Sequence, residues 1–234
     1  MNKLLPAAAA ASLLLLSSHA FAETRTFDVS AFNAIEVTSG ITADIAVGGT
    51  QSVSAEARNP KAFDDFRYEV RDGVLRVWYD WNIFRIFDFS DHEMRVTVSV
   101  PAIKALTVTS GASAAAQGVV ADEFKAEVTS GASAHIGNAQ AATYSISVTS
   151  GAHLDIDGSC TTATIEATTG SNLGAKDLLC SDVWASATTG ASLAITASGT
   201  ISGETTTGAS LTVYGSPEVK DLETSTGGSL TFPK

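Results

Sequence analysis

The chain is short of positive charge. Its 234 residues include 14 Lys and Arg against 25 Asp and Glu, which gives a formal net charge of −11 at pH 7. Binding to nucleic acid or to an anionic lipid surface requires clustered basic side chains, so the composition argues against both partners. Charged residues make up only 17% of the chain and hydrophobic residues 44%, a composition that excludes an intrinsically disordered chain.

A long hydrophobic run is also missing, apart from one near the start. Residues 1–22 contain Lys3, an apolar run from Leu4 to Leu16, and the small-x-small sequence Ala20-Phe21-Ala22. This order is typical of a secretory signal peptide that is cleaved after Ala22. The run is shorter than the roughly 20 residues that a membrane-spanning helix needs. We therefore expect a mature chain of residues 23–234, periplasmic or secreted, with no transmembrane segment.

What the sequence has in abundance is a repeated Thr/Ser-Gly motif. Seven consecutive copies are separated by 18 to 20 residues, and an eighth lies alone near the start at Gly40. The seven glycines are Gly111, Gly131, Gly151, Gly170, Gly190, Gly208 and Gly227. Self-similarity at a fixed period is the mark of a repeat architecture, in which each unit buries its apolar side only against its neighbours.

The residues around each glycine alternate between apolar and polar. Positions are counted here from the turn glycine of each repeat. For Gly151, positions −7, −5 and −3 are Tyr144, Ile146 and Val148, and positions +3 and +5 are Leu154 and Ile156. A period of two indicates strands with one buried face. We therefore predict an all-β fold, a parallel β-solenoid (β-helix) of roughly 18–20-residue coils. An antiparallel sandwich with regular turns is the alternative.

The first part of the chain is less regular than the rest. Residues 105–234 carry the regular repeats, whereas residues 23–104 contain two strand-like segments around Arg71-Asp72-Gly73, which is a hairpin signal. No linker separates the two parts. We expect a single domain in which residues 23–104 form the first coils and an irregular capping hairpin region, because solenoid ends need cover.

The order of these elements resembles a known bacterial family. Phe32–Gly40 (FNAIEVTSG) is followed by Gly73–Val77 (GVLRV), Val98–Pro101 (VSVP) and repeated Ser-Gly-Ala-Ser. This order is similar to that of the family described as putative auto-transporter adhesin, head GIN domain. The resemblance implies an exported β-solenoid of the bacterial cell envelope, and it supplies no catalytic residues.

The two cysteines occupy equivalent positions in neighbouring repeats. Cys160 and Cys180 each lie 10 residues before a turn glycine. Stacked coils place such positions about 4.8 Å apart, within the Cα range of a disulfide. We therefore predict a Cys160–Cys180 bond between adjacent coils.

Three polar residues could form a metal site. His135 at +4 of one coil, with His153 at +2 and Asp155 at +4 of the next, are all expected to point outward. Two imidazoles and a carboxylate are ligands for Zn²⁺ or Cu²⁺. The alternative is a solvated face with one ion pair. A periplasmic metal-binding protein is thus one candidate function, although we expect no resident cofactor.

An aromatic cluster is the other candidate site. It includes Trp78, Tyr79, Trp81 and Phe84, with Phe87 and Phe89 nearby. Exposed aromatic side chains could stack on sugar rings or dock a partner. The alternative is that the cluster caps the open core of the solenoid.

Evidence for catalysis is sparse in the sequence. Glu127, Glu166, Glu204 and Glu223 share the −4 position of different coils, with Ser147 and Ser186 between them, and the repeats contain no Arg. This column indicates a polar face and not an acid–base pair. We expect a non-catalytic adhesion, ligand-binding or structural protein whose partner is an envelope protein, a glycan or a second copy of the chain. A polysaccharide-active β-helix enzyme is the alternative.

Overall fold

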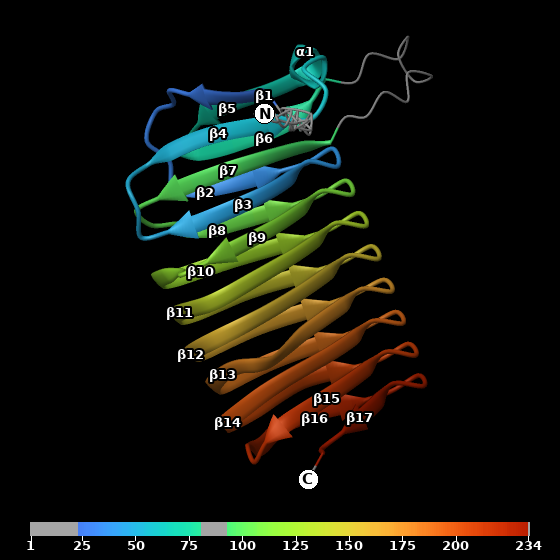
Figure 1. Cartoon of the computed structure of the whole chain (residues 1–234). Coiled ribbons are helices and arrows are strands. Elements are labelled where there is room, and N and C mark those ends of the chain that lie inside the picture. The colour runs from blue at the N-terminus through green and yellow to red at the C-terminus, as the bar shows by residue number, and fades with distance from the viewer. Residues whose placement is uncertain (1–22, 81–92, 234) are drawn as a thin grey trace, which may run out of the picture.

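The computed structural model describes residues 23–80 and 93–233, and it confirms the predicted parallel β-solenoid of about six turns. Successive coils stack in one column, with their tight turns aligned along one edge (Figure 1). The short helix α1 (Ala62–Asp65) lies near the N-terminal end of the column. Within the described ranges no helix is both long enough and apolar enough to cross a membrane.

The strands fall into a short-stranded N-terminal group and a regular group. The first group is β1 (Glu23–Phe27), β2 (Ala34–Val37), β3 (Thr42–Val47), β4 (Ser52–Ala57), β5 (Phe66–Arg71), β6 (Val74–Tyr79) and β7 (Met94–Val100). The second is β8 (Ala105–Val108), β9 (Ser113–Gln117), β10 (Val120–Val128), β11 (Ser133–Val148), β12 (His153–Ala167), β13 (Asn172–Ala187), β14 (Ser192–Thr205), β15 (Ser210–Gly215), β16 (Glu218–Thr224) and β17 (Ser229–Thr231).

Each long strand runs along both sides of its coil. In β11 the first five residues pair in parallel with β9, and eight of the last nine pair with β10. Between these parts the chain bends at Asn138, whose φ of 51° is left-handed and whose N–H donates to Asp157 Oδ2 at 2.9 Å. A coil therefore has two flat sides, joined by this bend at one edge and by the glycine turn at the other.

The glycine turns form a continuous hydrogen-bonded column. Both central residues of each turn have positive φ, for example 57° at Ser130 and 69° at Gly131, which defines a type I′ turn. The N–H of Gly131 donates to the carbonyl of Ser150 in the next coil at 3.1 Å, and this bond recurs down the stack. The turn at Gly40 joins the column through its N–H to the carbonyl of Ser110.

The core is a thin interior between the two flat sides. Inward residues come from positions −7, −5 and −3 on one side and +1, +3 and +5 on the other, as the alternation predicts. Phe124 and Tyr144 pack edge to face, with ring centroids 6.0 Å apart. The Tyr144 hydroxyl has no hydrogen-bond partner among the residues that the structure describes. Burial together with the nearby Asp157 charge raises the pKa of Tyr144 to about 12.

The N-terminal region closes one end of the stack, although not in chain order. The coil of β2 and β3 lies between the later coils β6/β7 and β8/β9, with parallel pairing on both sides. Beyond it, β5 pairs antiparallel with β6, while β4 pairs antiparallel with β7 and then with β1. The predicted hairpin at Arg71-Asp72-Gly73 is the β5–β6 connection. At the other end, β16 and β17 have a neighbouring strand on one side only within the described chain.

Candidate functional site

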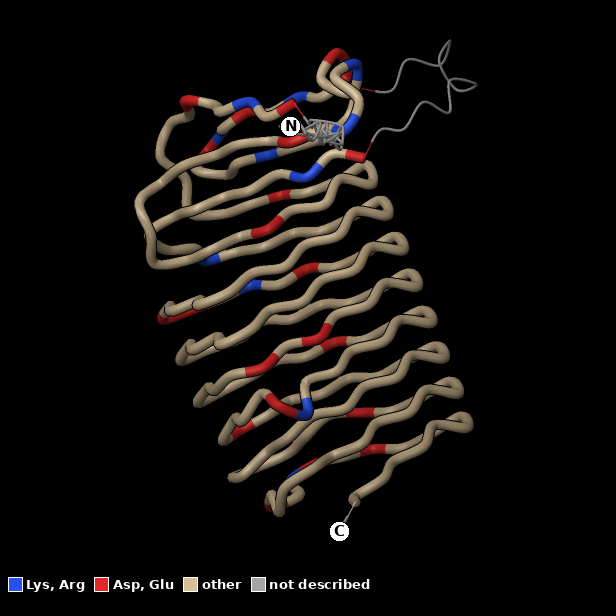
Figure 2. The backbone as a smooth tube through the Cα atoms, viewed as in Figure 1, with Lys and Arg blue, Asp and Glu red and all other residues tan. Residues whose placement is uncertain are grey.

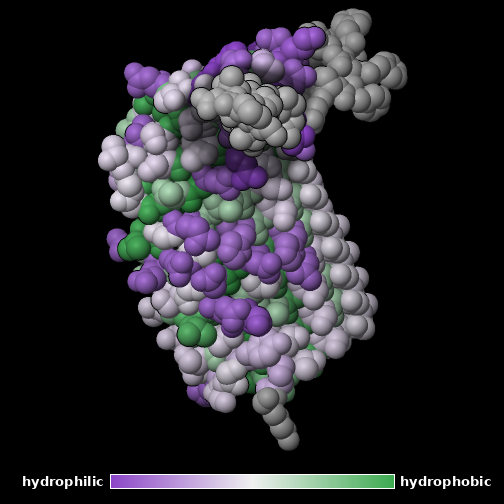
Figure 3. Space-filling model, in the orientation of Figure 1, coloured by the Kyte–Doolittle hydropathy of each residue, from purple (hydrophilic) through white to green (hydrophobic). Residues whose placement is uncertain are grey.

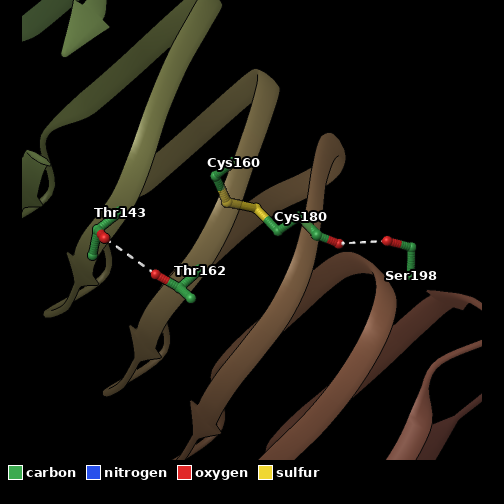
Figure 4. The surroundings of a disulfide bond; sticks show 5 residues. All are labelled: Thr143, Cys160, Thr162, Cys180 and Ser198. Carbon is green, nitrogen blue, oxygen red and sulfur yellow. Dashed lines mark hydrogen bonds between the residues drawn. A yellow bond between two sulfur atoms is a disulfide. The ribbon is translucent and has the colours of Figure 1, made fainter. Parts of the chain in front are cut away.

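The predicted disulfide joins β12 to β13. Cys160 and Cys180 are direct partners across the parallel ladder, with Cα atoms 4.5 Å apart and sulfur atoms bonded (Figure 4). Cys180 is buried and its carbonyl accepts a hydrogen bond from Ser198 Oγ at 3.2 Å. The bond is thus built into the wall of the solenoid and leaves no thiol free for chemistry in the described residues.

The histidine group is only partly brought together. His135 and Asp155 are ladder partners as expected, but the Asp155 carboxylate contacts His153 on its own strand, with Nε2 and Oδ2 2.9 Å apart. Both side chains are about half exposed. In the described part of the chain no three His, Cys, Asp or Glu side chains form a group that could hold a metal ion. A metal centre is therefore not part of the function proposed below.

The two described residues of the aromatic cluster differ in how deeply they are buried. Tyr79 is only 4% exposed and lies in the hydrophobic core, while Trp78 on the other side of β6 is half-buried. Burial is also the main reason that the pKa of Tyr79 is well above its usual value. Trp81 and Phe84 lie outside the described residues. Tyr79 therefore packs as part of the capping region, and its ring is not presented to solvent.

A broad polar surface covers the strand segments that precede the turns. Its outward side chains form four columns, at positions −8, −6, −4 and −2 counted from the turn glycine of each coil. We call this surface the hydroxyl face. It consists of Glu123, Lys125, Glu127 and Thr129; Thr143, Ser145, Ser147 and Thr149; Thr162, Thr164, Glu166 and Thr168; Asp182, Trp184, Ser186 and Thr188; and Thr200, Ser202, Glu204 and Thr206. Hydroxyls of adjacent coils meet directly, as at Thr143 and Thr162, whose oxygens are 3.1 Å apart (Figure 4).

Trp184 interrupts the hydroxyl face. It is the one aromatic side chain among those twenty positions, and 38% of its surface is exposed. Its ladder partners are Thr164 and Ser202, and Asp182 and Ser186 lie two residues away on the same strand. Sequence reasoning did not single out Trp184. The alternation that places Val183 and Ala185 inward already predicts that Trp184 points outward, and that was the available signal.

Charge is distributed unevenly along the stack. Most Lys and Arg lie in the N-terminal capping region, and the coils below it carry mainly Asp and Glu (Figure 2). In the capping region Arg76 pairs with Glu36 at 3.0 Å and Arg95 with Asp44. The turn edge, in contrast, forms a regular row of side chains of near-neutral hydropathy (Figure 3). The hydroxyl face thus lies on the acidic part of the molecule.

Together, the stacked coils and the long flat outer surface define a class of protein, the parallel β-solenoids. Within this class the chain belongs to the family described as "Putative auto-transporter adhesin, head GIN domain", which it matches over residues 31–217. The resemblance found in the sequence is therefore confirmed. The family name indicates a non-catalytic, adhesion-type protein. No curated protein matches the chain.

Solved structures share the fold at low sequence identity. A crystal structure of a putative adhesin from Bacteroides fragilis superposes with a TM-score of 0.82 at 15% identity, covering 91% of this chain and 97% of that one. A putative adhesin from Parabacteroides merdae gives 0.70 at 14%, covering 91% and 96%. A structure named as a putative lipid binding protein from Parabacteroides distasonis gives 0.67 at 14%, covering 91% and 97%. At these identities the likeness concerns the fold alone.

Proposed function

We propose that the protein is exported to the bacterial cell envelope and acts there by non-catalytic binding through its hydroxyl face. One observation carries this proposal: the face presents columns of short Ser and Thr side chains at a fixed spacing on a rigid, disulfide-linked scaffold. Such a surface offers many hydrogen-bonding groups with little conformational entropy to lose on binding. The family to which the chain belongs is named for adhesion.

The arrangement of carboxylates favours binding over polysaccharide cleavage. Glu166 and Glu204 are separated by Ser186 in the same column, and both carboxylates are exposed on a flat surface. A general acid for glycoside hydrolysis needs a desolvated carboxyl close to the scissile bond, which a cleft provides. The hydroxyl face has tight corners on both sides and no long loop in the described residues that would enclose a substrate.

Export is tested with the full-length chain. We expect expression in a Gram-negative bacterium to place the protein in the periplasm or the medium, with Glu23 as its first residue, because residues 1–22 have the composition of a cleaved leader. The measurements are cell fractionation and the intact mass of the purified protein. The variant Leu14→Arg, which interrupts the apolar run, is expected to accumulate unprocessed in the cytoplasm. An unprocessed wild-type chain in the cytoplasm would contradict export.

Binding through the hydroxyl face is tested with a matched pair of variants. Thr164→Lys places a long charged side chain in the centre of this face, whereas Asn172→Lys makes the same kind of change on the other flat side of the coil. We expect Thr164→Lys to weaken binding of the fluorescently labelled mature protein to isolated bacterial envelopes at least tenfold, and Asn172→Lys to leave it unchanged. Equal binding by both variants would show that the hydroxyl face is not the binding surface.

A further inference from the structure

We propose that Trp184 is the platform of a binding site for a neutral sugar ring. This inference rests on the proposed binding role of the hydroxyl face and names the chemical class of its ligand. The core does not need the indole, because Val183 and Ala185 fill the inward positions on either side of it and are both buried. The 38% of the Trp184 surface that stays exposed is therefore available to a ligand.

The neighbours of Trp184 leave space for a ring to approach. Thr164 and Ser202, on the flanking coils, and Ser186, two residues along the strand, are all short side chains. The indole is therefore the largest group in this part of the face. The face of an indole carries negative charge density, and the C–H groups on one side of a pyranose ring pack favourably against it.

Three carboxylates surround this platform at distances that suit the hydroxyls of a stacked sugar. Glu166 and Glu204 occupy the diagonal positions on the coils before and after Trp184, about 7–8 Å away by sheet geometry. Asp182 lies two residues away on the same strand. Its Oδ1 accepts hydrogen bonds from Thr200 N at 3.1 Å and Oγ1 at 2.6 Å, which hold the carboxylate in place.

These carboxylates have acceptor positions available for a ligand. Glu204 Oε1 accepts a bond from Ser186 Oγ at 3.3 Å, and Glu166 has no side-chain hydrogen bond or ion pair within the described residues. Hydrogen bonds from sugar hydroxyls to carboxylates are charge-assisted and stronger than those between neutral groups. An aromatic platform with carboxylate acceptors around it thus offers groups for both the C–H face and the hydroxyls of a sugar ring.

The charge around Trp184 selects a neutral glycan over an anionic one. The basic residue in its column is Lys125, three coils and therefore about 14 Å away. Lys125 also pairs with Glu127 at 3.2 Å. Lys220 lies in the coil beyond Ser202, two coils from Trp184, and pairs with Glu218 at 2.6 Å. A phosphate, sulfate or uronate group placed on the platform would therefore meet three carboxylates, while these two lysines already pair with acidic side chains of their own strands. A single stacking residue also implies weak binding per site, which an adhesion protein compensates by presenting many copies.

The test is affinity gel electrophoresis of the mature protein in a panel of soluble polysaccharides. The neutral members are a β-glucan, a mannan, a galactan and a xyloglucan, and alginate is the anionic member. We expect at least one neutral polysaccharide to retard the wild type and alginate to have no effect. Trp184→Ala should weaken this retardation at least tenfold, while Trp184→Phe should stay within about threefold of the wild type because it keeps an aromatic face.

Controls separate the sugar site from other effects. Leu179→Ser removes an exposed apolar side chain from the same strand, outside the hydroxyl face, and should leave retardation unchanged. Glu166→Gln and Glu204→Gln keep hydrogen-bonding oxygens and should weaken a neutral ligand only a few fold. Thermal unfolding followed by circular dichroism confirms that each variant is folded.

Three results would overturn the inference: no neutral polysaccharide retards the wild type, Trp184→Ala is retarded like the wild type, or alginate is the ligand. The envelope-binding assay distinguishes this failure from failure of the proposed function. If Trp184→Ala still binds envelopes while Thr164→Lys does not, the hydroxyl face binds a partner other than a neutral sugar. If neither variant loses envelope binding, the proposed function itself is wrong.

Discussion

Replacing Gly158 by alanine is expected to destabilise the solenoid by about 3 kcal/mol or more. Gly158 lies at the bend between the two parts of β12 with φ of +142°, and a Cβ built there would lie 1.8 Å from the carbonyl oxygen of Ala139. That oxygen belongs to the backbone of the neighbouring coil, where Ala139 is buried and is the ladder partner of Gly158. The clash cannot be relieved by a side-chain rotation, so the coils must separate.

A second glycine provides the control. Gly170 also has positive φ, +68°, but in the described structure no atom other than those of its chain neighbours lies within 4 Å of a Cβ built there. Gly170→Ala should therefore cost only the left-handed backbone strain, about 1–2 kcal/mol. The measurement is the guanidinium unfolding midpoint of both variants at 25 °C. If Gly158→Ala is no more destabilising than Gly170→Ala, close packing between coils is not the reason for this glycine.

The regular half of the fold could be predicted because the repeat encodes it locally. One Thr/Ser-Gly motif per coil sets the turn, and the alternation around it sets the inward positions, so a single repeat contains the information for the whole stack. Residues 105–233 follow that rule closely. The sequence did not indicate that Ser130 and its equivalents share the positive φ of the glycine. The type I′ geometry requires this, since both central residues turn the same way.

The N-terminal stacking order could not be predicted. Gly40 carries the same motif as the regular coils, but 71 residues separate it from Gly111. In the structure the two turns are adjacent, and the coil of β6 and β7 lies on the far side of β2 and β3. This arrangement depends on pairing between distant segments. Residues 74–100 have no glycine turn of the repeat type that would have placed them.

The candidate sites, too, could be predicted from the sequence only in part. The repeat spacing correctly predicted that His135 and Asp155 are ladder partners. It could not predict that the Asp155 carboxylate contacts His153 on its own strand, because that contact depends on side-chain rotamers. Trp184 was predictable as an outward residue. Its proposed role as a binding platform depends on the short hydroxyl side chains beside it on the flanking coils. The pairing of these coils was needed to identify those neighbours.

Removing the disulfide is expected to lower the free energy of global unfolding by about 3 kcal/mol. The bond closes a loop of 20 residues between Cys160 and Cys180, and its absence restores conformational freedom to the unfolded chain. The double variant Cys160→Ala/Cys180→Ala should therefore unfold at a lower guanidinium concentration than the oxidised wild type. Dithiothreitol should lower the wild-type midpoint towards that of the variant and should not affect the variant itself.

The effect should also depend on position along the stack, because each coil contacts mainly its neighbours. Among the described strands β16 and β17 have one neighbour each, so the chain beyond Cys180 can open without breaking the loop that the bond closes. Hydrogen exchange should therefore accelerate strongly in β12 and β13 when the bond is lost, and little in β15 to β17. Uniform acceleration along the whole chain would show that the coils unfold as one cooperative unit. An unchanged unfolding midpoint would show instead that the ladder hydrogen bonds between β12 and β13 suffice to hold these coils together, and that the bond adds nothing to their stability.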